Sequence, residues 1–151
     1  MTKIDFDKIS EEVISILEKE QSIVLATAAN DKVTARTISH VNDGLTIYFQ
    51  TGTSSEKFQQ MKSNPNTAFA VGNMQIEAVV EICGHPNKNP HFIELYKAKF
   101  PRYFELYTNH EDEIVIKAIP QKVKFWKYFD GAPCCEMVDL IHRKAYRENH
   151  S

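Results

Sequence analysis

The chain has 151 residues and a mass of 17.4 kDa, and its 18 Lys and Arg residues stand against 20 Asp and Glu residues. A net charge of −2 excludes a global electrostatic attraction to nucleic acid or to acidic membranes. No apolar stretch approaches the ~20 residues of a membrane helix, and three cysteines are too few for a disulfide framework. The acidic first residues do not look like a secretory signal. We therefore expect one domain spanning residues 1–151, located in the cytoplasm, with neither a nucleic acid nor a membrane as a partner.

The first half of the chain predicts one helix and then a β-rich block. Apolar residues at helical spacing predict a helix over about residues 6–20. A continuous apolar run predicts a buried strand from Ser22 to Ala29, and alternating patterns predict strands from Val33 to Val41 and from Leu45 to Thr51. Because only short polar turns separate these three strands, we expect them to form an antiparallel meander.

The second half combines helices with further strands. Thr53 and Glu56 fit a capping box, in which Thr53 caps a helix and Glu56 reaches back to it. The remaining predicted elements are strands over 67–71, 75–83, 113–119 and 122–129, the last two broken at Pro120, and a helix from Pro90 to about Phe100. The tail from Gly131 is ambiguous. Short strands with a few inserted helices favour a mainly β fold, a closed or nearly closed antiparallel barrel, and no nucleotide-binding GxGxxG motif or P-loop is present.

Two segments have the chemistry of an anion site. Arg36 lies in the middle of a predicted strand, so its charge must be paired, face a ligand or reach solvent. The segment from Thr51 to Lys57 runs from a strand into a helix and brings together hydroxyls, free backbone N–H groups and a lysine, which suits a phosphate. An ordinary capped helix with a surface lysine would show the same pattern. If the strand of Arg36 pairs with the strand before this turn, Arg36 and Lys57 could hold one dianion together.

Trp126 shares its strand face with lysines and not with the neighbouring apolar series. An aromatic residue displaced in this way marks an interface or a stacking site, or lies over the exterior of the barrel. Gln75 similarly lies on the polar face of its strand. The histidines and cysteines show no metal-ligand spacing, redox motif or nucleophile motif. We therefore expect no metal and name no catalytic residue.

Four stretches carry a resemblance to a known family: IVLATAANDKVTARTISHV, LTIYFQTGTSSEKFQQMKSNPNTAFAV, QIEAVVEICG and IPQKVKFW. They cover residues 23–83 well and residues 113–126 more loosely. Together they resemble the FMN-binding split-barrel proteins related to pyridoxamine 5'-phosphate oxidase. This resemblance implies a six-stranded antiparallel split β-barrel and a homodimer with FMN in clefts at the subunit interface. It also implies a flavoprotein that acts as an FMN-dependent oxidoreductase on a small molecule.

The resemblance implies a cofactor-binding set of Arg36, Thr37, Ile38, Ser39, Gln50, Thr51, Ser55, Lys57, Gln75 and Trp126. In this set Arg36, Ser55 and Lys57 correspond to phosphate contacts. The backbone of residues 37–39 corresponds to the part that faces the flavin ring, and residues 50–51 to contacts with the ring and the ribityl chain. The last two members would reach the flavin from the second subunit.

The chain departs from the oxidase at the substrate site. The oxidase has an Arg-x-His-x-Arg segment there, but Ala132, Cys134 and Glu136 occupy those positions here, so we do not expect the oxidase activity itself. One hypothesis is that the chain is a reductase of the family's nitroimidazole-resistance branch. Other readings stay open at this point: a non-catalytic flavin-binding or redox-sensing module, or a split barrel that holds haem or a deazaflavin.

Overall fold

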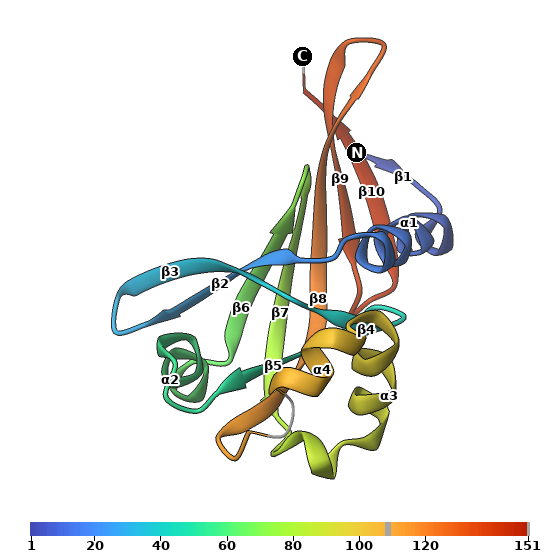
Figure 1. The fold of residues 1–151 in the computed structure, drawn as a ribbon. Coiled ribbons are helices and arrows are strands. Elements are labelled where there is room, and N and C mark those ends of the chain that lie inside the picture. The colour runs from blue at the N-terminus through green and yellow to red at the C-terminus, as the bar shows by residue number, and fades with distance from the viewer. Residues whose placement is uncertain (108–109, 151) are drawn as a thin grey trace.

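A computed structural model describes residues 1–107 and 110–150 and contains one antiparallel sheet with helices around it (Figure 1). In chain order the elements are β1 (Thr2–Lys3), α1 (Phe6–Lys19), β2 (Ile23–Ala29), β3 (Lys32–Ile38), β4 (Val41–Asp43), β5 (Thr46–Gly52), α2 (Glu56–Ser63), β6 (Asn66–Val71), β7 (Met74–Ile82), the 3₁₀ turn η1 (Pro86–Lys88), α3 (Pro90–Lys99), α4 (Pro101–Tyr107), β8 (Glu113–Phe129), β9 (Ala132–Asp139) and β10 (Lys144–Asn149). No helix among the described residues is long and apolar enough to cross a membrane.

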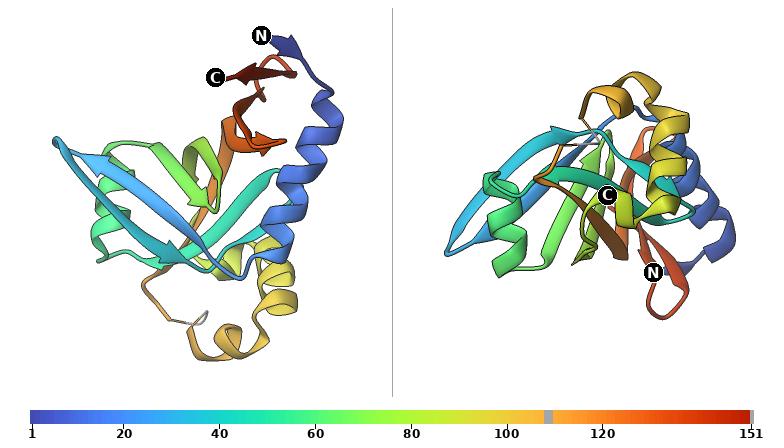
Figure 2. Two further views of the ribbon diagram at one scale, coloured as in Figure 1. Left: turned by 90° about the horizontal axis from the view of Figure 1, so that it is seen from above. Right: turned by 60° about the horizontal axis from the view of Figure 1, so that its bottom comes forward.

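Six strands follow one another in the order β3-β2-β6-β7-β8-β5 and make up the barrel wall. The 17-residue strand β8 is the hub of the sheet. Its first part pairs with β5, its second part pairs with β9, and β7 runs along its other edge. Strands β9, β10 and β1 extend the sheet beyond the barrel, and the tip of the β8–β9 hairpin projects past the other strands (Figures 1 and 2).

The predicted break at Pro120 is wrong, because β8 passes through this residue without interruption. Pro120 lies opposite Ala78, and the β7–β8 register shifts between Glu77 and Ala78. A proline cannot donate a ladder hydrogen bond, and a β-bulge is one of the few places in a sheet where this is tolerated.

The predicted meander of three strands holds only in part: β2 pairs with β3 and β4 forms the expected hairpin with β5, but the strand predicted from Val33 to Val41 is divided in two. Strand β3 ends at Ile38 and pairs with β2, whereas β5 pairs with β4 and β8. His40 explains the separation, because its ring Nε2 lies 2.7 Å from the Leu17 carbonyl oxygen and its own carbonyl oxygen accepts a hydrogen bond of 2.9 Å from Lys99. This stretch of backbone is therefore bound to helices α1 and α3 instead of to a neighbouring strand.

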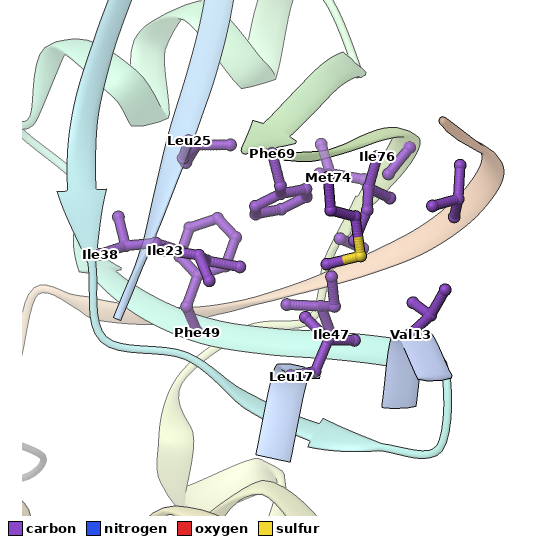
Figure 3. Packing of buried hydrophobic residues seen from close by; sticks show 14 of the residues in the cluster. Val13, Leu17, Ile23, Leu25, Ile38, Ile47, Phe49, Phe69, Met74 and Ile76 are labelled. Atoms are coloured by element: carbon purple, nitrogen blue, oxygen red, sulfur yellow. The ribbon is translucent and has the colours of Figure 1, made fainter. Parts of the chain in front are cut away.

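The core fills the space between the barrel wall and α1 (Figure 3). Phe49 and Phe69 meet edge to face with 6.2 Å between ring centroids, and Val13 and Leu17 of α1 approach from another side. Burying large apolar side chains in this way provides most of the driving force for folding. A second cluster, which includes Phe92, Tyr96 and Phe100, packs α3 against β4 and β8.

Candidate functional site

A cavity of about 230 Å³ opens between the end of β3, strand β5, the first turn of α2, helix α3 and the start of β8. We call it the β5–α2 cavity. Its lining residues are Thr37, Ile38, Ser39, Gln50, Lys57, Tyr96 and Glu113. Five of these seven are residues that the family resemblance assigned to a cofactor, although they come from three separate segments. Tyr96 and Glu113 were not expected from the sequence.

Polar groups in this cavity lack partners within the protein. Gln50 Oε1 and Glu113 Oε2 are buried and make no hydrogen bond. The half-buried Lys57 makes no hydrogen bond or ion pair with any of the described residues that surround it. A buried polar atom without a partner costs roughly 1–3 kcal/mol. The cavity therefore suits a ligand that carries both a negative charge and hydrogen-bond donors.

The charges around Lys57 act on one another. Burial lowers the pKa of Lys57, the positive charge of Arg36 lowers it further, and the carboxylate of Glu113 opposes both effects. Burial also raises the pKa of Glu113, and Asp112 adds to this rise. A bound anion would favour the charged form of Lys57 and relieve its repulsion from Arg36.

The turn before α2, which leads into the lining residue Lys57, is the candidate anion end of the cavity. Ser55, and not Thr53 as predicted, is the N-cap: its Oγ accepts a hydrogen bond of 3.2 Å from the Phe58 backbone N–H. The Thr51 and Ser55 hydroxyl oxygens lie 3.0 Å apart. The predicted capping box fails because Glu56 is already the first residue of the helix, where it forms an exposed ion pair of 2.9 Å with Lys32.

Arg36 does not line the cavity, and its strand β3 pairs with β2 and not with β5, the strand that leads into this turn. Its guanidinium donates hydrogen bonds to the Leu25 carbonyl at 3.3 Å, to Thr27 Oγ1 at 2.7 Å and to Thr34 Oγ1. Both threonine hydroxyls also donate to Gln60 Oε1 of α2. Burial lowers the pKa of Arg36, and the charge of Glu56 opposes this effect. Neutral oxygens thus hold Arg36 in the barrel wall, and from there its positive charge contributes to the lowered pKa of Lys57.

Gln60 is a contributor to the site that the sequence did not reveal. It is 6% exposed, a polar residue on the buried side of α2 beside Phe58 and Met61. The pattern that could have indicated its role is a polar residue on the apolar face of a helix, because a buried polar side chain needs hydrogen-bond partners.

Gln75 and Trp126 lie away from the cavity within this chain. Gln75 is exposed on β7 and pairs in register with Lys124 of β8. Trp126 is 42% exposed, with its ring centroid 6.2 Å from that of Tyr128 and 5.2 Å from that of His150. Both side chains are therefore exposed at the surface of this chain.

The three positions that depart from the oxidase lie in strand β9. Glu136 is buried there, and its two carboxylate oxygens bond to Lys127 at 2.5 Å and to Arg147 at 2.6 Å. Cys134 is buried, and Ala132 is exposed. An acidic group already neutralised by its neighbours cannot hold a substrate phosphate. In the described part of the chain, no group of three His, Cys, Asp or Glu residues could hold a metal ion.

A family model covers most of the chain. The profile described as "Pyridoxamine 5'-phosphate oxidase" matches residues 9–127, which is most of the chain. The chain belongs to this family. General stress protein 26 of Bacillus subtilis (strain 168) is 27% identical over 131 residues, which cover 83% of this chain and 93% of that protein.

Solved structures show the split-barrel fold of the family. A Clostridium acetobutylicum protein related to general stress protein 26 superposes with a TM-score of 0.70 at 15% identity, covering 93% of this chain and 99% of its own. HutZ, described as the heme storage protein of Vibrio cholerae, superposes with a TM-score of 0.63 at 12% identity, covering 73% of this chain and 88% of its own. At such identities the likeness establishes the fold and not a ligand.

Proposed function

We propose that this protein is a flavoprotein that binds FMN in the β5–α2 cavity and acts as an FMN-dependent oxidoreductase of the pyridoxamine 5'-phosphate oxidase-related type. The observation that carries the proposal is the cavity itself. Residues from β3, β5 and α2 that resemble the family's FMN contacts line one space, and that space contains an unpartnered lysine and buried acceptors without partners.

Each part of the cavity suits a part of FMN. Lys57, with the positive charge of Arg36, balances the phosphate charge, and Ser55 with the N–H groups at the start of α2 donates hydrogen bonds to it. The backbone of residues 37–39 faces the flavin ring, and residues 50–51 lie between the two ends. FMN, when bound, supplies the hydride and electron chemistry, while the protein binds and orients it. We do not propose the oxidase activity, because Glu136 is paired within the protein.

The test begins with the absorption spectrum of the freshly purified protein, which we expect to be that of an oxidised flavin. The double substitution Arg36→Ala and Lys57→Ala removes both cations. We expect it to weaken FMN binding about 100-fold, because the charged hydrogen bond of Lys57 contributes about 1.5–3 kcal/mol and the positive charge of Arg36 is lost with it. The control is Lys62→Ala with Arg102→Ala, which removes two exposed cations elsewhere. If the first variant retains FMN as tightly as the control, the assignment of FMN to the β5–α2 cavity is wrong.

Turnover distinguishes the enzyme from a non-catalytic flavin module. We expect oxidation of reduced nicotinamide in the presence of a quinone or a nitro compound, and turnover with a nitroimidazole would support the nitroimidazole-resistance branch. No turnover with any acceptor, in a protein that binds FMN, would favour the binding or sensing module. A Soret band in place of the flavin spectrum would instead indicate haem.

We further propose a homodimer in which Gln75 and Trp126 of one protomer complete the cavity of the other. An open depression of about 500 Å³ on β2, β6 and β7, lined in part by Ala26, Ala28 and Ala68, gives another protomer room for close approach. Light scattering coupled to size exclusion should give twice the monomer mass of 17.4 kDa. A monomer with bound flavin would contradict the shared site.

The cytoplasmic location stays a prediction, supported by the three free cysteines.

A further inference from the structure

We propose that Glu113 is a specificity-determining residue of the β5–α2 cavity: its buried Oε2 accepts a hydrogen bond from a hydroxyl of the chain that joins the ligand's anionic group to its ring. This inference rests on the proposed function, because it takes FMN as the ligand. Glu113 was not among the residues expected from the sequence or from the resemblance. It enters the site only through the pairing of β8 with β5.

The position of Glu113 places it near the anion end of the cavity. It is the first residue of β8 and lies opposite Gly52, the last residue of β5 before the turn that leads to Ser55 and Lys57. The backbone N–H of Thr53 donates to the Asp112 carbonyl at 2.9 Å, which holds the start of β8 against this turn. Glu113 and Lys57 each oppose the other's pKa shift, and the buried Oε2 of Glu113 has no hydrogen-bond partner, so this oxygen can accept from a ligand.

The chemistry of Glu113 favours a neutral donor over an anion. The titratable groups that act on its pKa are Asp112, His110, Lys57 and His85, and its own carboxylate would repel a phosphate oxygen. A hydroxyl group, in contrast, satisfies a buried carboxylate oxygen without adding charge. The ligand group nearest to a phosphate held by Lys57 is the hydroxyl-bearing chain, since the ring lies further along, towards residues 37–39. Gln50, whose Oε1 is the second buried acceptor of the cavity, suits a donor in the same way.

Three ligands separate these contributions: FMN, riboflavin, which lacks the phosphate, and a flavin whose ring is joined to phosphate by a hydroxyl-free pentyl chain. Dissociation constants are measured by quenching of flavin fluorescence with wild-type protein and with Glu113→Ala. We expect Glu113→Ala to weaken FMN and riboflavin by about tenfold each and the hydroxyl-free flavin by less than twofold. Glu113→Gln retains one acceptor oxygen, so its loss should be smaller than that of Glu113→Ala. Glu81→Ala, an exposed carboxylate on β7, is the matched control, and circular dichroism checks that each variant is folded.

The other outcomes are distinct. If Glu113→Ala weakens all three ligands equally, the donor lies in the ring or the effect is indirect, and the hydroxyl assignment is overturned. If it weakens only the two phosphate-bearing ligands, Glu113 acts through Lys57, which also overturns it. Unchanged binding of FMN by Glu113→Ala overturns the inference but leaves the proposed function standing. If the wild-type protein binds none of the three ligands, the proposed function fails and this inference fails with it.

Discussion

Two carboxylates of this protein have opposite surroundings. Glu136, between β8 and β10, is 2% exposed, and both of its oxygens bond to cations. Glu113, at the start of β8, has a buried oxygen without any partner, although Lys57 is close enough to affect its pKa. The Glu136 cluster is electrostatically complete within one chain, whereas the β5–α2 cavity is not. This contrast supports a structural role for the Glu136 cluster and the proposed ligand-binding role for the cavity.

The pKa directions express the same contrast. Burial alone would raise the pKa of Glu136, but hydrogen bonds from Lys127 and Arg147, together with their charges, lower it overall. The pKa of Lys127 is correspondingly raised: burial opposes its charge, but Glu12 and Glu136 outweigh that effect. For Glu113, in contrast, burial raises the pKa and the neighbouring cations do not compensate for it.

The largest effect on stability is expected from Glu136→Gln. This change leaves the ammonium of Lys127 and the guanidinium of Arg147 without their shared anion, and breaking a buried pair is strongly destabilising. We expect the free energy of unfolding at pH 7 to fall by about 3 kcal/mol in urea denaturation. A loss below about 0.5 kcal/mol would show that the cluster does not stabilise the fold. It would contradict the contrast between Glu136 and Glu113.

A smaller effect with the opposite sign is expected from Glu113→Gln in the ligand-free protein. The raised folded-state pKa means that ionised Glu113 destabilises the fold at neutral pH, so the variant should be more stable than wild type. Because Glu113 is partly exposed and solvent screens its charge, we expect a gain of only a few tenths of a kcal/mol. This difference should vanish as the pH falls through the raised folded pKa to below the ordinary value of 4.5.

For Glu136→Gln the stability difference should have the opposite sign: at neutral pH the wild type is the more stable protein. Because the folded-state pKa of Glu136 is lowered, its contribution to stability is present above pH 4.5 and is lost as the pH falls through the lower folded value. Urea denaturation between pH 3 and pH 7 compares the two variants. Parallel pH profiles for both would contradict the distinction between a completed and an incomplete site.

Much of the fold could be predicted from local patterns. Helix α1, helix α3 and the strands β2, β3, β5, β6 and β7 follow from apolar periodicity and turn residues, because these signals act over a few neighbouring residues. Strands β9 and β10 were not predicted, because the sequence of the tail from Gly131 is ambiguous. They form by pairing with each other and with β8. Helix α4 was missed, since Pro101 suggested an end to the preceding helix and in fact begins the next one.

The sequence by itself determined which chemical groups are available to the site: the guanidinium of Arg36, the hydroxyls before α2 and the ammonium of Lys57. Their spacing at the junction of a strand and a helix already indicated an anion site, because backbone N–H groups are free there. Only the tertiary structure decided which groups lack partners. Sheet register places Glu113 opposite Gly52, and the bulge at Glu77 and Ala78 lets β8 continue through Pro120. Both depend on contacts between residues far apart in the chain, whose geometry no local pattern contains.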